Sequence, residues 1–367
     1  MVTVCHLSTV HQRRDVRIVY KECASLAKAG HKVHLVIADG QGDETFQEVR
    51  IHGVRKYGRR LPRIILSPWN LLFKALSLKA AVYHFHDMEL LPIGVLLRLL
   101  GRRVIYDVHD NLPKQIMGKH YLPKFLRPLL AGLIGGLEAA LSRSLSGIVT
   151  ADANKEKRFR KYHPLVVTVH NYPLLEELGL VREGTRDPRC VCYVGGITKI
   201  RGILQLLDAI RPLDVKLLLA GVFEPPELEA ECRLHPSWEK VEYKGYQDRQ
   251  GVAEILSTAS VGMVNLLPNE NYLDSLPIKM FEYMSAGVPV IASNFPDWQG
   301  IVDKYECGVC IDPLKMEEIT AAISALLEDR EKAELMGRRG RAAIVKDLNW
   351  DSEAEILKRL YEEVLSR

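Results

Sequence analysis

Residues 274–293 read Asp-Ser-Leu-Pro-Ile-Lys-Met-Phe-Glu-Tyr-Met-Ser-Ala-Gly-Val-Pro-Val-Ile-Ala-Ser, and this stretch decides how the rest of the chain is interpreted. It predicts a loop, a helix and a buried strand. Pro277 suits the first turn of a helix, where its missing N–H is not needed. Gly287 supplies a left-handed exit, and Pro289 follows where the helix cannot continue. Helical spacing places on one face Ile278, Phe281, Met284 and Ser285.

The mouth of the predicted helix is formed by Ser275, Leu276, Pro277 and Ile278. Backbone N–H groups at a helix start have no helical partners, and the helix dipole favours an anion there. Lys279 adds a positive charge in the first turn, where the dipole alone disfavours one. Because helix stability does not explain this lysine, the sequence predicts an anion bound at the mouth.

Glu282 is the second polar residue of this helix that suits a ligand. It lies roughly 7–8 Å along the axis from Pro277, at the standard rise per residue. Its Cα–Cβ bond tilts toward the helix start, so its carboxylate can face a ligand at the mouth. A phosphate on the amides and a ribose diol on Glu282 fit this separation. A core helix with a solvated lysine and glutamate fits equally well.

The acid at Asp274, the glutamate at Glu282 and the following Ala-Gly-x-Pro-Val-Ile-Ala-Ser run resemble the signature of a known family. This family is GT4, the group 1 glycosyltransferases, which are retaining and use nucleotide sugars. The first acid of the family's signature is usually Glu, so Asp274 has a side chain that is shorter by one methylene group. The resemblance implies an α/β fold of the GT-B type, with two Rossmann-like domains facing a cleft and a C-terminal helix that crosses back to the first domain.

The length of 367 residues exceeds the usual size of a single core and predicts two domains. Residues 172–188 are polar and contain Pro173, Gly184 and Pro188, which is typical of a linker. The predicted domains are therefore 1–172, completed by a helix at about 351–367, and 173–350. The resemblance implies that the first domain binds the acceptor and the second binds the nucleotide sugar.

The net charge of +4 conceals an asymmetry between the two halves of the chain. Residues 1–180 hold 27 Lys and Arg against 15 Asp and Glu, or +12, whereas residues 181–367 sum to −8. The basic half is expected to meet an anionic surface or acceptor. Without a signal peptide or an apolar run of membrane-spanning length, the sequence predicts a cytoplasmic protein. Seven cysteines, an odd number, argue against a complete disulfide framework.

The first half opens with a strand at residues 2–8, a helix and a strand at residues 32–37, which is a βαβ pattern. The loop between them, His11-Gln-Arg-Arg-Asp15, lacks the glycines of a dinucleotide fingerprint, and this argues against an NAD enzyme. Asp15 and Arg17 resemble the Asp-x-Arg turn of one GT4 subgroup and are assigned to the acceptor side. Asp15 is interpreted either as a contact to an acceptor hydroxyl or as a helix N-cap.

Two later strand ends carry polar clusters, His84-Phe-His86-Asp87 and Asp107-Val-His109-Asp110. Alternation puts His84 and His86 on one face, so these residues could hold a divalent metal. A polar acceptor pocket is the favoured alternative, because a metal site also needs ligands that converge on one point. The resemblance in addition implies an enzyme that needs neither metal nor cofactor. The family pattern assigns His109, His86 and Asp87 to the acceptor side.

Basic and apolar residues alternate along residues 112–132, and Arg59, Arg60 and Arg63 form a second basic cluster. Such mixtures suit the surface of an anionic leaflet, where each base contributes about 1 kcal/mol. A solvated loop followed by a core helix is an equally good interpretation.

The second half is predicted to start with a strand at residues 191–194 that leads into Gly195 and Gly196, where a ligand can approach the backbone closely. The family has an arginine after the first glycine and a lysine before the later one. Here Gly196 replaces the arginine, and Arg201 stands at the lysine position. Arginine binds phosphate as a fork, and Lys279 or Lys199 could compensate for the missing charge. Tyr246 is interpreted either as a contact to the nucleobase or as a tyrosine packed on the surface.

The sequence thus predicts a retaining hexosyl- or N-acetylhexosaminyl-transferase of cell-envelope polysaccharide synthesis. Arg201 and Lys279 would stabilise the leaving diphosphate, Glu282 would hold the ribose, and Asp274 would contact the donor sugar. The expected partners are a UDP-, GDP- or dTDP-sugar, a glycan or polyprenyl-diphosphate-linked acceptor and the inner face of the plasma membrane, but no nucleic acid. The alternatives are a nucleotide-sugar 2-epimerase and a non-catalytic, membrane-associated binding protein.

Overall fold

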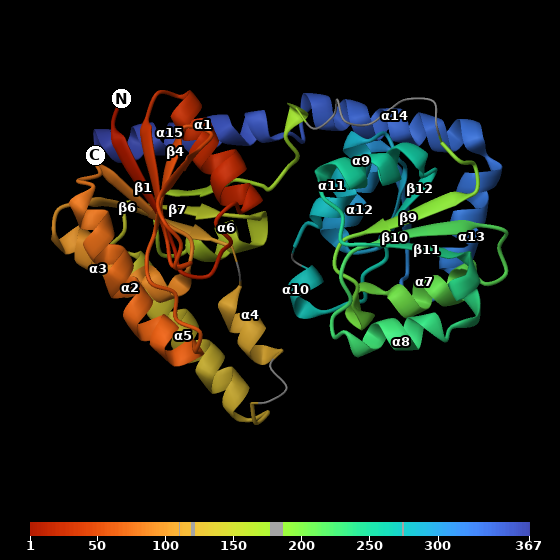
Figure 1. Ribbon diagram of the computed structural model, residues 1–367, viewed down its shortest axis with the longest axis horizontal. Helices are drawn as coiled ribbons and strands as arrows, with labels where there is room; N and C mark the ends of the chain where they lie inside the picture. Colours follow the sequence, from red (N-terminus) through yellow and green to blue (C-terminus); the bar gives the residue numbers. More distant parts are fainter. Residues whose placement is uncertain (110, 119–121, 177–185, 274) are drawn as a thin grey trace. The chain divides into compact units, whose positions relative to one another are not determined.

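The computed structural model describes residues 1–109, 111–118, 122–176, 186–273 and 275–367. They form two compact units, each built on one sheet with helices packed against it (Figure 1). Unit 1 comprises Met1–Asn171 and Trp350–Arg367, and unit 2 comprises Tyr172–Asn349. The prediction of an α/β protein with two parallel-sheet units is confirmed.

The sheet of unit 1 has the strand order β3-β4-β2-β1-β5-β6-β7-β8, and every neighbouring pair is parallel except β3 and β4. Its central strands are buried almost throughout, as expected for a parallel sheet covered on both faces. The strands are β1 Thr3–Ser8, β2 Lys32–Ile37, β3 Glu44–Phe46, β4 Val49–Gly53, β5 Val82–Phe85, β6 Arg103–Val108, β7 Gly147–Thr150 and β8 Val166–Thr168.

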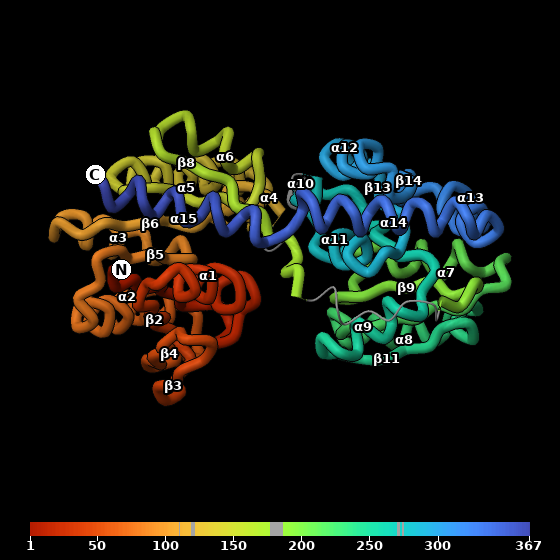
Figure 2. The backbone as a smooth tube through the Cα atoms, turned by 90° about the horizontal axis from the view of Figure 1, so that it is seen from above, coloured from red at the N-terminus to blue at the C-terminus, as the bar shows by residue number. Residues whose placement is uncertain are grey.

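The hairpin of β3 and β4 forms the edge of this sheet opposite β8 (Figure 2). Sequence reasoning missed it, because β3 has only three residues and its flanks are polar. Its turn places Gln47 and Glu48 at positive φ, where neither residue type gives a turn signal.

The helical elements of unit 1 include a π-helix, η1, which follows the first strand. Its buried residues include Arg17 and Glu22. The helical elements are η1 Val16–Cys23, α1 Ala24–Lys28, α2 Arg60–Ser77, η2 Met88–Leu90, α3 Leu91–Leu99, α4 Leu112–Met117, α5 Leu126–Ser142, α6 Ala153–Phe159 and α15 Trp350–Ser366.

The C-terminal helix α15 belongs to unit 1, so the prediction that it returns to the first domain is confirmed. It packs against η1 and β8 (Figure 2). Trp350 donates from Nε1 to Ser25 Oγ at 2.8 Å, and Arg103 donates to the carbonyl of Val364 at 2.9 Å. Both ends of the chain therefore build one core.

The sheet of unit 2 has the order β11-β10-β9-β12-β13-β14, and all its neighbouring pairs are parallel. Its strands are β9 Cys190–Val194, β10 Lys216–Ala220, β11 Val241–Gly245, β12 Val261–Val264, β13 Val290–Ser293 and β14 Gly308–Ile311. Its helical elements are η4 Lys199–Arg201, α7 Ile203–Ile210, α8 Glu227–Arg233, η5 Pro236–Lys240, α9 Arg249–Thr258, α10 Glu270–Leu273, α11 Ile278–Ser285, α12 Pro296–Tyr305, α13 Met316–Glu328 and α14 Arg330–Lys346.

In the part of the chain that the structure describes, no helix combines the length and apolar character needed to cross a bilayer. All seven cysteines are free thiols, and all but the half-buried Cys310 are buried. This agrees with the prediction that the chain has no complete disulfide framework.

Candidate active site

The helix mouth predicted from the sequence is the start of α11, but its details differ from the prediction. Pro277 is the N-cap and lies just before the helix, which begins at Ile278. The Ser275 N–H donates to the carbonyl of Tyr272 at 3.3 Å, because the short helix α10 turns back there. Ser275 therefore does not offer its amide to a ligand as predicted. Its carbonyl accepts a 2.6 Å hydrogen bond from Trp298 Nε1, which holds this loop.

Lys279 is buried, so the alternative of a solvated lysine is wrong. Its Nζ lies 3.5 Å from the centroid of the Tyr193 ring and has no hydrogen-bond partner among the described residues. Ile278 was predicted to share a helix face with Phe281 and Met284, but it is 45% exposed, whereas those two side chains are buried. Burial, reinforced by the charge of Arg201, lowers the pKa of Lys279 well below its ordinary value. A buried amine without a partner is costly, and an anion would relieve that cost.

The turn after β9 lies against this amine. Gly195 has φ +120°, and a Cβ built on it would lie 3.6 Å from Lys279 Nζ. A Cβ on Gly196 would lie only 2.6 Å from Arg201 Nη1. Arg201 donates from Nη1 to the Gly196 carbonyl at 3.1 Å and from Nε to Tyr272 Oη at 3.4 Å. Gly196 therefore makes room for Arg201, and the arginine that the family carries at this position would displace it.

The remaining residues predicted for the donor side fall into different environments. Lys199 is exposed, and its amine already pairs with Glu231. Tyr246 directly follows β11 and is 78% exposed. Glu282 lies one turn along α11 and is half-buried. Asp274 lies outside the described residues.

Sequence reasoning missed the side chains that support this turn. Tyr193 donates from Oη to the Gly196 carbonyl at 3.0 Å, and Tyr283 Oη accepts the Val194 N–H at 2.8 Å. Both rings are buried beneath the glycine turn. Tyr193 comes from β9 and Tyr283 from α11, and the sequence gives no signal that these two elements touch.

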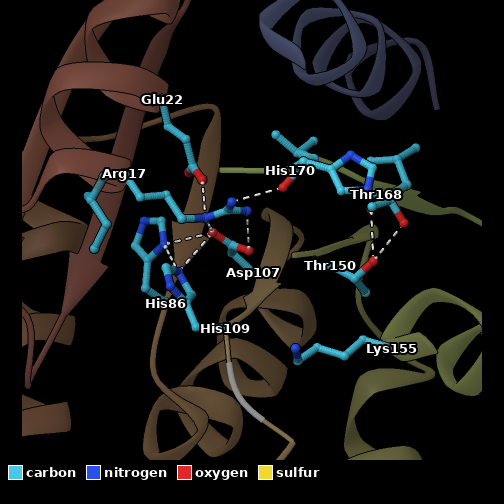
Figure 3. Close-up of polar contacts among 12 residues, drawn as sticks. Arg17, Glu22, His86, Asp107, His109, Thr150, Lys155, Thr168 and His170 are labelled. Atoms are coloured by element: carbon cyan, nitrogen blue, oxygen red, sulfur yellow. Dashed lines mark hydrogen bonds and ion pairs between the residues drawn. The ribbon is translucent and has the colours of Figure 1, made fainter. Parts of the chain in front are cut away.

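Unit 1 contains a buried polar network at the carboxyl ends of β5 and β6 (Figure 3). Arg17 donates to both carboxylate oxygens of Asp107, from Nε at 3.2 Å and from Nη2 at 3.1 Å. It also donates from Nη1 to the Val169 carbonyl at 2.8 Å, and its Nε lies 3.0 Å from Glu22 Oε1. Arg17 was expected to face an acceptor, but its donors are used inside the unit. It fixes Asp107 instead.

Asp107 in turn holds two histidines. His109 Nε2 lies 2.9 Å and His86 Nδ1 lies 3.2 Å from its Oδ2 (Figure 3). Burial raises the pKa of Asp107, but the charge of Arg17 and the contacts with His109 and His86 outweigh it and hold this pKa well below the usual range. Burial lowers the pKa of His86 to about 4, so its ring is neutral at pH 7. His109 keeps 17% of its side chain exposed and is the accessible member of this group.

The other residues assigned to the acceptor side have structural partners. Asp15 Oδ1 accepts the Ile18 N–H at 3.0 Å, so the N-cap alternative is confirmed. Asp87 is buried, and it accepts the Thr9 N–H at 2.6 Å and the Ser8 hydroxyl at 2.9 Å. His86 is likewise buried and shares a 2.9 Å contact with His6. Of the predicted acceptor-side group, His109 is the residue best placed to meet another molecule.

Glu22, His84, His86 and Asp107 place potential ligand atoms within 4.8 Å of one another. A metal is nevertheless a poor fit, because the guanidinium of Arg17 already binds both oxygens of Asp107. A cation there would meet this fixed positive charge at short range. The cluster is better described as a polar network that orients His109.

Two parallel-sheet α/β units of this kind are the architecture of the GT-B glycosyltransferases. The family model "Glycosyltransferase Family 4" matches residues 16–172, and "Glycosyl transferases group 1" matches residues 182–343. The chain belongs to the group 1, family 4 glycosyltransferases.

Individual relatives agree with this assignment. The chain is 26% identical over 302 residues to an MMP α-(1→4)-mannosyltransferase of Mycolicibacterium hassiacum, covering 77% of this chain and 71% of that protein. It is 23% identical to sulfoquinovosyl transferase SQD2 of Arabidopsis thaliana, covering 86% of this chain and 64% of that protein. Sucrose-phosphate synthase from Thermosynechococcus elongatus shares the fold with a TM-score of 0.80, at 18% identity and full coverage of both chains. These relatives support glycosyl transfer rather than epimerisation.

Proposed function

We propose that this glycosyltransferase moves a hexosyl group, with retention of configuration, from a nucleotide sugar bound by unit 2 to a glycan or lipid-linked acceptor of the cell envelope. The observation that carries the proposal is the buried Lys279 amine, which lies beside the Gly195 turn with no partner among the described residues. A diphosphate is an anion of the right chemistry for this position, since it can also accept from the amides that open α11.

We assign each residue of the donor site a role. Lys279 and Arg201 stabilise the negative charge that develops on the leaving diphosphate, and this charge is met by groups already in place. Glu282, one turn along α11, holds the ribose hydroxyls. Asp274 contacts the donor sugar, and Tyr246 offers its exposed ring to the base. No metal or cofactor takes part in this scheme.

On the acceptor side, His109 meets the hydroxyl that attacks the sugar. Asp107 accepts a hydrogen bond from the His109 ring and fixes its orientation, and Arg17 keeps Asp107 charged. The same arrangement leaves His86 and Asp87 as supports within the unit rather than as acceptor contacts.

The donor base is proposed to be uracil or guanine. A fold neighbour, Anabaena HepE, was solved in complex with UDP and UDP-glucose, and its TM-score to this chain is 0.74 in the UDP complex. A relative 33% identical over 82 residues is named a GDP-mannose-dependent phosphatidylinositol monomannoside mannosyltransferase. The acceptor of the present enzyme is then proposed to be lipid-linked, and the basic first half of the chain would lie at an anionic leaflet.

A donor panel tests the proposal directly. Thermal unfolding is measured with UDP-, GDP- and dTDP-sugars, because a ligand that binds only the folded state raises the transition temperature. One donor class is expected to stabilise the protein, and nucleotide release is expected to require an acceptor. Conversion of a donor without any acceptor would indicate an epimerase, and no stabilisation by any donor would reject the site.

Replacement of Glu282 by alanine is expected to lower kcat/KM for the donor about 100-fold or more while leaving the thermal transition in place. The physical reason is the loss of hydrogen bonds from a carboxylate to the ribose, each worth about 1.5–3 kcal/mol. The matched control is Glu254→Ala on α9, an exposed glutamate of the same unit. Activity of Glu282→Ala within about twofold of wild type would show that the ribose assignment is wrong.

A further inference from the structure

Two helices of unit 1 expose regular apolar stripes that nothing in the described chain covers. On α2, residues four apart form one stripe, and a second stripe with the same spacing follows α5 from its N-cap. Their members are between 48% and 77% exposed: Leu61, Ile65, Trp69 and Phe73 on α2, and Phe125, Leu129, Leu133 and Leu137 along α5. Side chains at this spacing lie on one face of a helix.

The stripes face away from the core. The sheet-facing side of α2 consists of Ser67, Pro68, Leu71, Leu72 and Ala75, all buried. On α5 the buried residues are Ala131, Glu138 and Ser142, which lie on the opposite side of the helix from the stripe. Helix α3 contacts both α2 and α5, so the three helices belong to one layer of unit 1 (Figure 1).

The two stripes lack the charges that normally cover a solvated helix face. No charged residue occurs between Arg63 and Lys74 on α2, or between Arg127 and Glu138 on α5. Glu138 is buried, where it accepts from Tyr106 Oη and pairs with Arg158. A surface helix of a protein in water carries polar residues on its outer face, and these two do not.

Positive charge lies at the ends of both stripes. Arg59 and Arg60 are exposed at the start of α2, and Lys124 is exposed just before α5. An apolar face with a basic border is the pattern of helices that lie in the interface of an anionic bilayer. A second protein would need a complementary acidic rim, whereas a lipid headgroup layer supplies the anions everywhere.

We infer that α2 and α5 together form a docking surface for an anionic lipid bilayer, with the two stripes entering the apolar edge of the leaflet. The basic residues steer the protein to the headgroups, and the apolar side chains then hold it. This rests on the part of the proposed function that places the basic first half at an anionic leaflet, and it names the apolar surface that enters the leaflet. It does not depend on the chemistry of the donor site.

The test is sedimentation with vesicles of phosphatidylglycerol and phosphatidylcholine, at low salt and at about 1 M salt, where the Debye length is about 3 Å. Wild type is expected to retain a salt-resistant bound fraction. At high salt, the variant Leu129→Gln/Leu133→Gln is expected to bind the vesicles at least tenfold more weakly than wild type. Glutamine preserves the helix propensity of leucine but removes its apolar surface. The control Leu335→Gln/Val345→Gln changes two exposed apolar residues of α14 in unit 2 and is expected to bind as wild type.

A second readout uses Trp69, the most exposed of the four tryptophans. Its fluorescence is expected to shift to the blue on vesicle addition, and the shift is expected to vanish in Trp69→Phe. Equal high-salt binding of Leu129→Gln/Leu133→Gln and wild type would overturn the inference. So would a lipid-free dimer of wild type that the same variant converts to monomer, since the stripes would then be covered by a second copy. Donor-induced thermal stabilisation, measured in parallel, reports on the proposed function alone.

Discussion

Lys279→Met is expected to weaken binding of the nucleoside diphosphate by about 10- to 100-fold, the range for loss of a hydrogen bond to a charged group. Methionine fills the same buried space over the Tyr193 ring but carries no amine. Since the buried amine has no hydrogen-bond partner among the described residues, its removal is expected to preserve or raise the free energy of unfolding. Calorimetric titration and thermal unfolding measure the two quantities together.

The same residue predicts a pH dependence. Burial holds the pKa of Lys279 low in the donor-free protein, and a bound diphosphate would raise it. Between the low pKa of Lys279 in the donor-free protein and its higher pKa in the complex, binding of the diphosphate must therefore take up a proton. Over this range the affinity for the diphosphate falls as the pH rises. Titrations in buffers of different ionisation enthalpy are expected to reveal this uptake in wild type and its absence in Lys279→Met.

The matched control for both experiments is Lys199→Met, which removes an exposed lysine from the same turn region. It is expected to change neither affinity nor proton uptake. Unchanged diphosphate affinity in Lys279→Met, or proton uptake equal in the two variants, would contradict the assignment of Lys279 to the anion.

Asp107→Asn is expected to cost unit 1 about 3–5 kcal/mol of stability, the usual consequence of removing one partner of a buried ion pair. Arg17 would keep its contact with Glu22 but lose both bonds to the carboxylate. The pKa of Asp107 is depressed in the folded state, so its contribution is present above the unfolded pKa of about 3.8 and is lost as the pH falls through the folded value.

Urea unfolding at neutral pH measures this change, fitted with separate transitions if the two units unfold independently. The control is Asp43→Asn in the same unit, whose carboxylate pairs with His52 and Lys74 at the surface. Exposed pairs of this kind contribute about 1 kcal/mol or less. A cost for Asp107→Asn no larger than that of Asp43→Asn would show that Arg17 is held by other groups.

Much of the fold could be predicted because parallel strands are buried on both faces and appear as short apolar runs. Strand β2 has the predicted bounds, and β1 and β9 differ from their predicted bounds by one residue, at the start of each strand. The strands of the β3–β4 hairpin do not appear as short apolar runs, because strands at the edge of a sheet are only partly buried and need fewer apolar residues. The helix mouth of α11 was found, because its residue pattern is local.

The sequence could not show what surrounds each candidate residue. The burial of Lys279 depends on Tyr193 in β9, and the role of Arg17 depends on Asp107 in β6. Alternation correctly placed His84 and His86 on one face, and both rings stack there. It could not indicate that Arg17 and Glu22, from a π-helix, occupy the space beside them.

The return of α15 to unit 1 affects the order in which the chain can fold during synthesis. Tyr361, near the end of α15, is bonded to His84 at 2.8 Å and to His6 at 3.2 Å, so the innermost part of unit 1 includes a segment that is synthesised after the whole of unit 2. Unit 2 is continuous in sequence and can complete its sheet first. The amino-terminal half must then wait, partly open, until translation has passed Tyr361, and a nascent chain stalled before that point would expose it to chaperones and proteases.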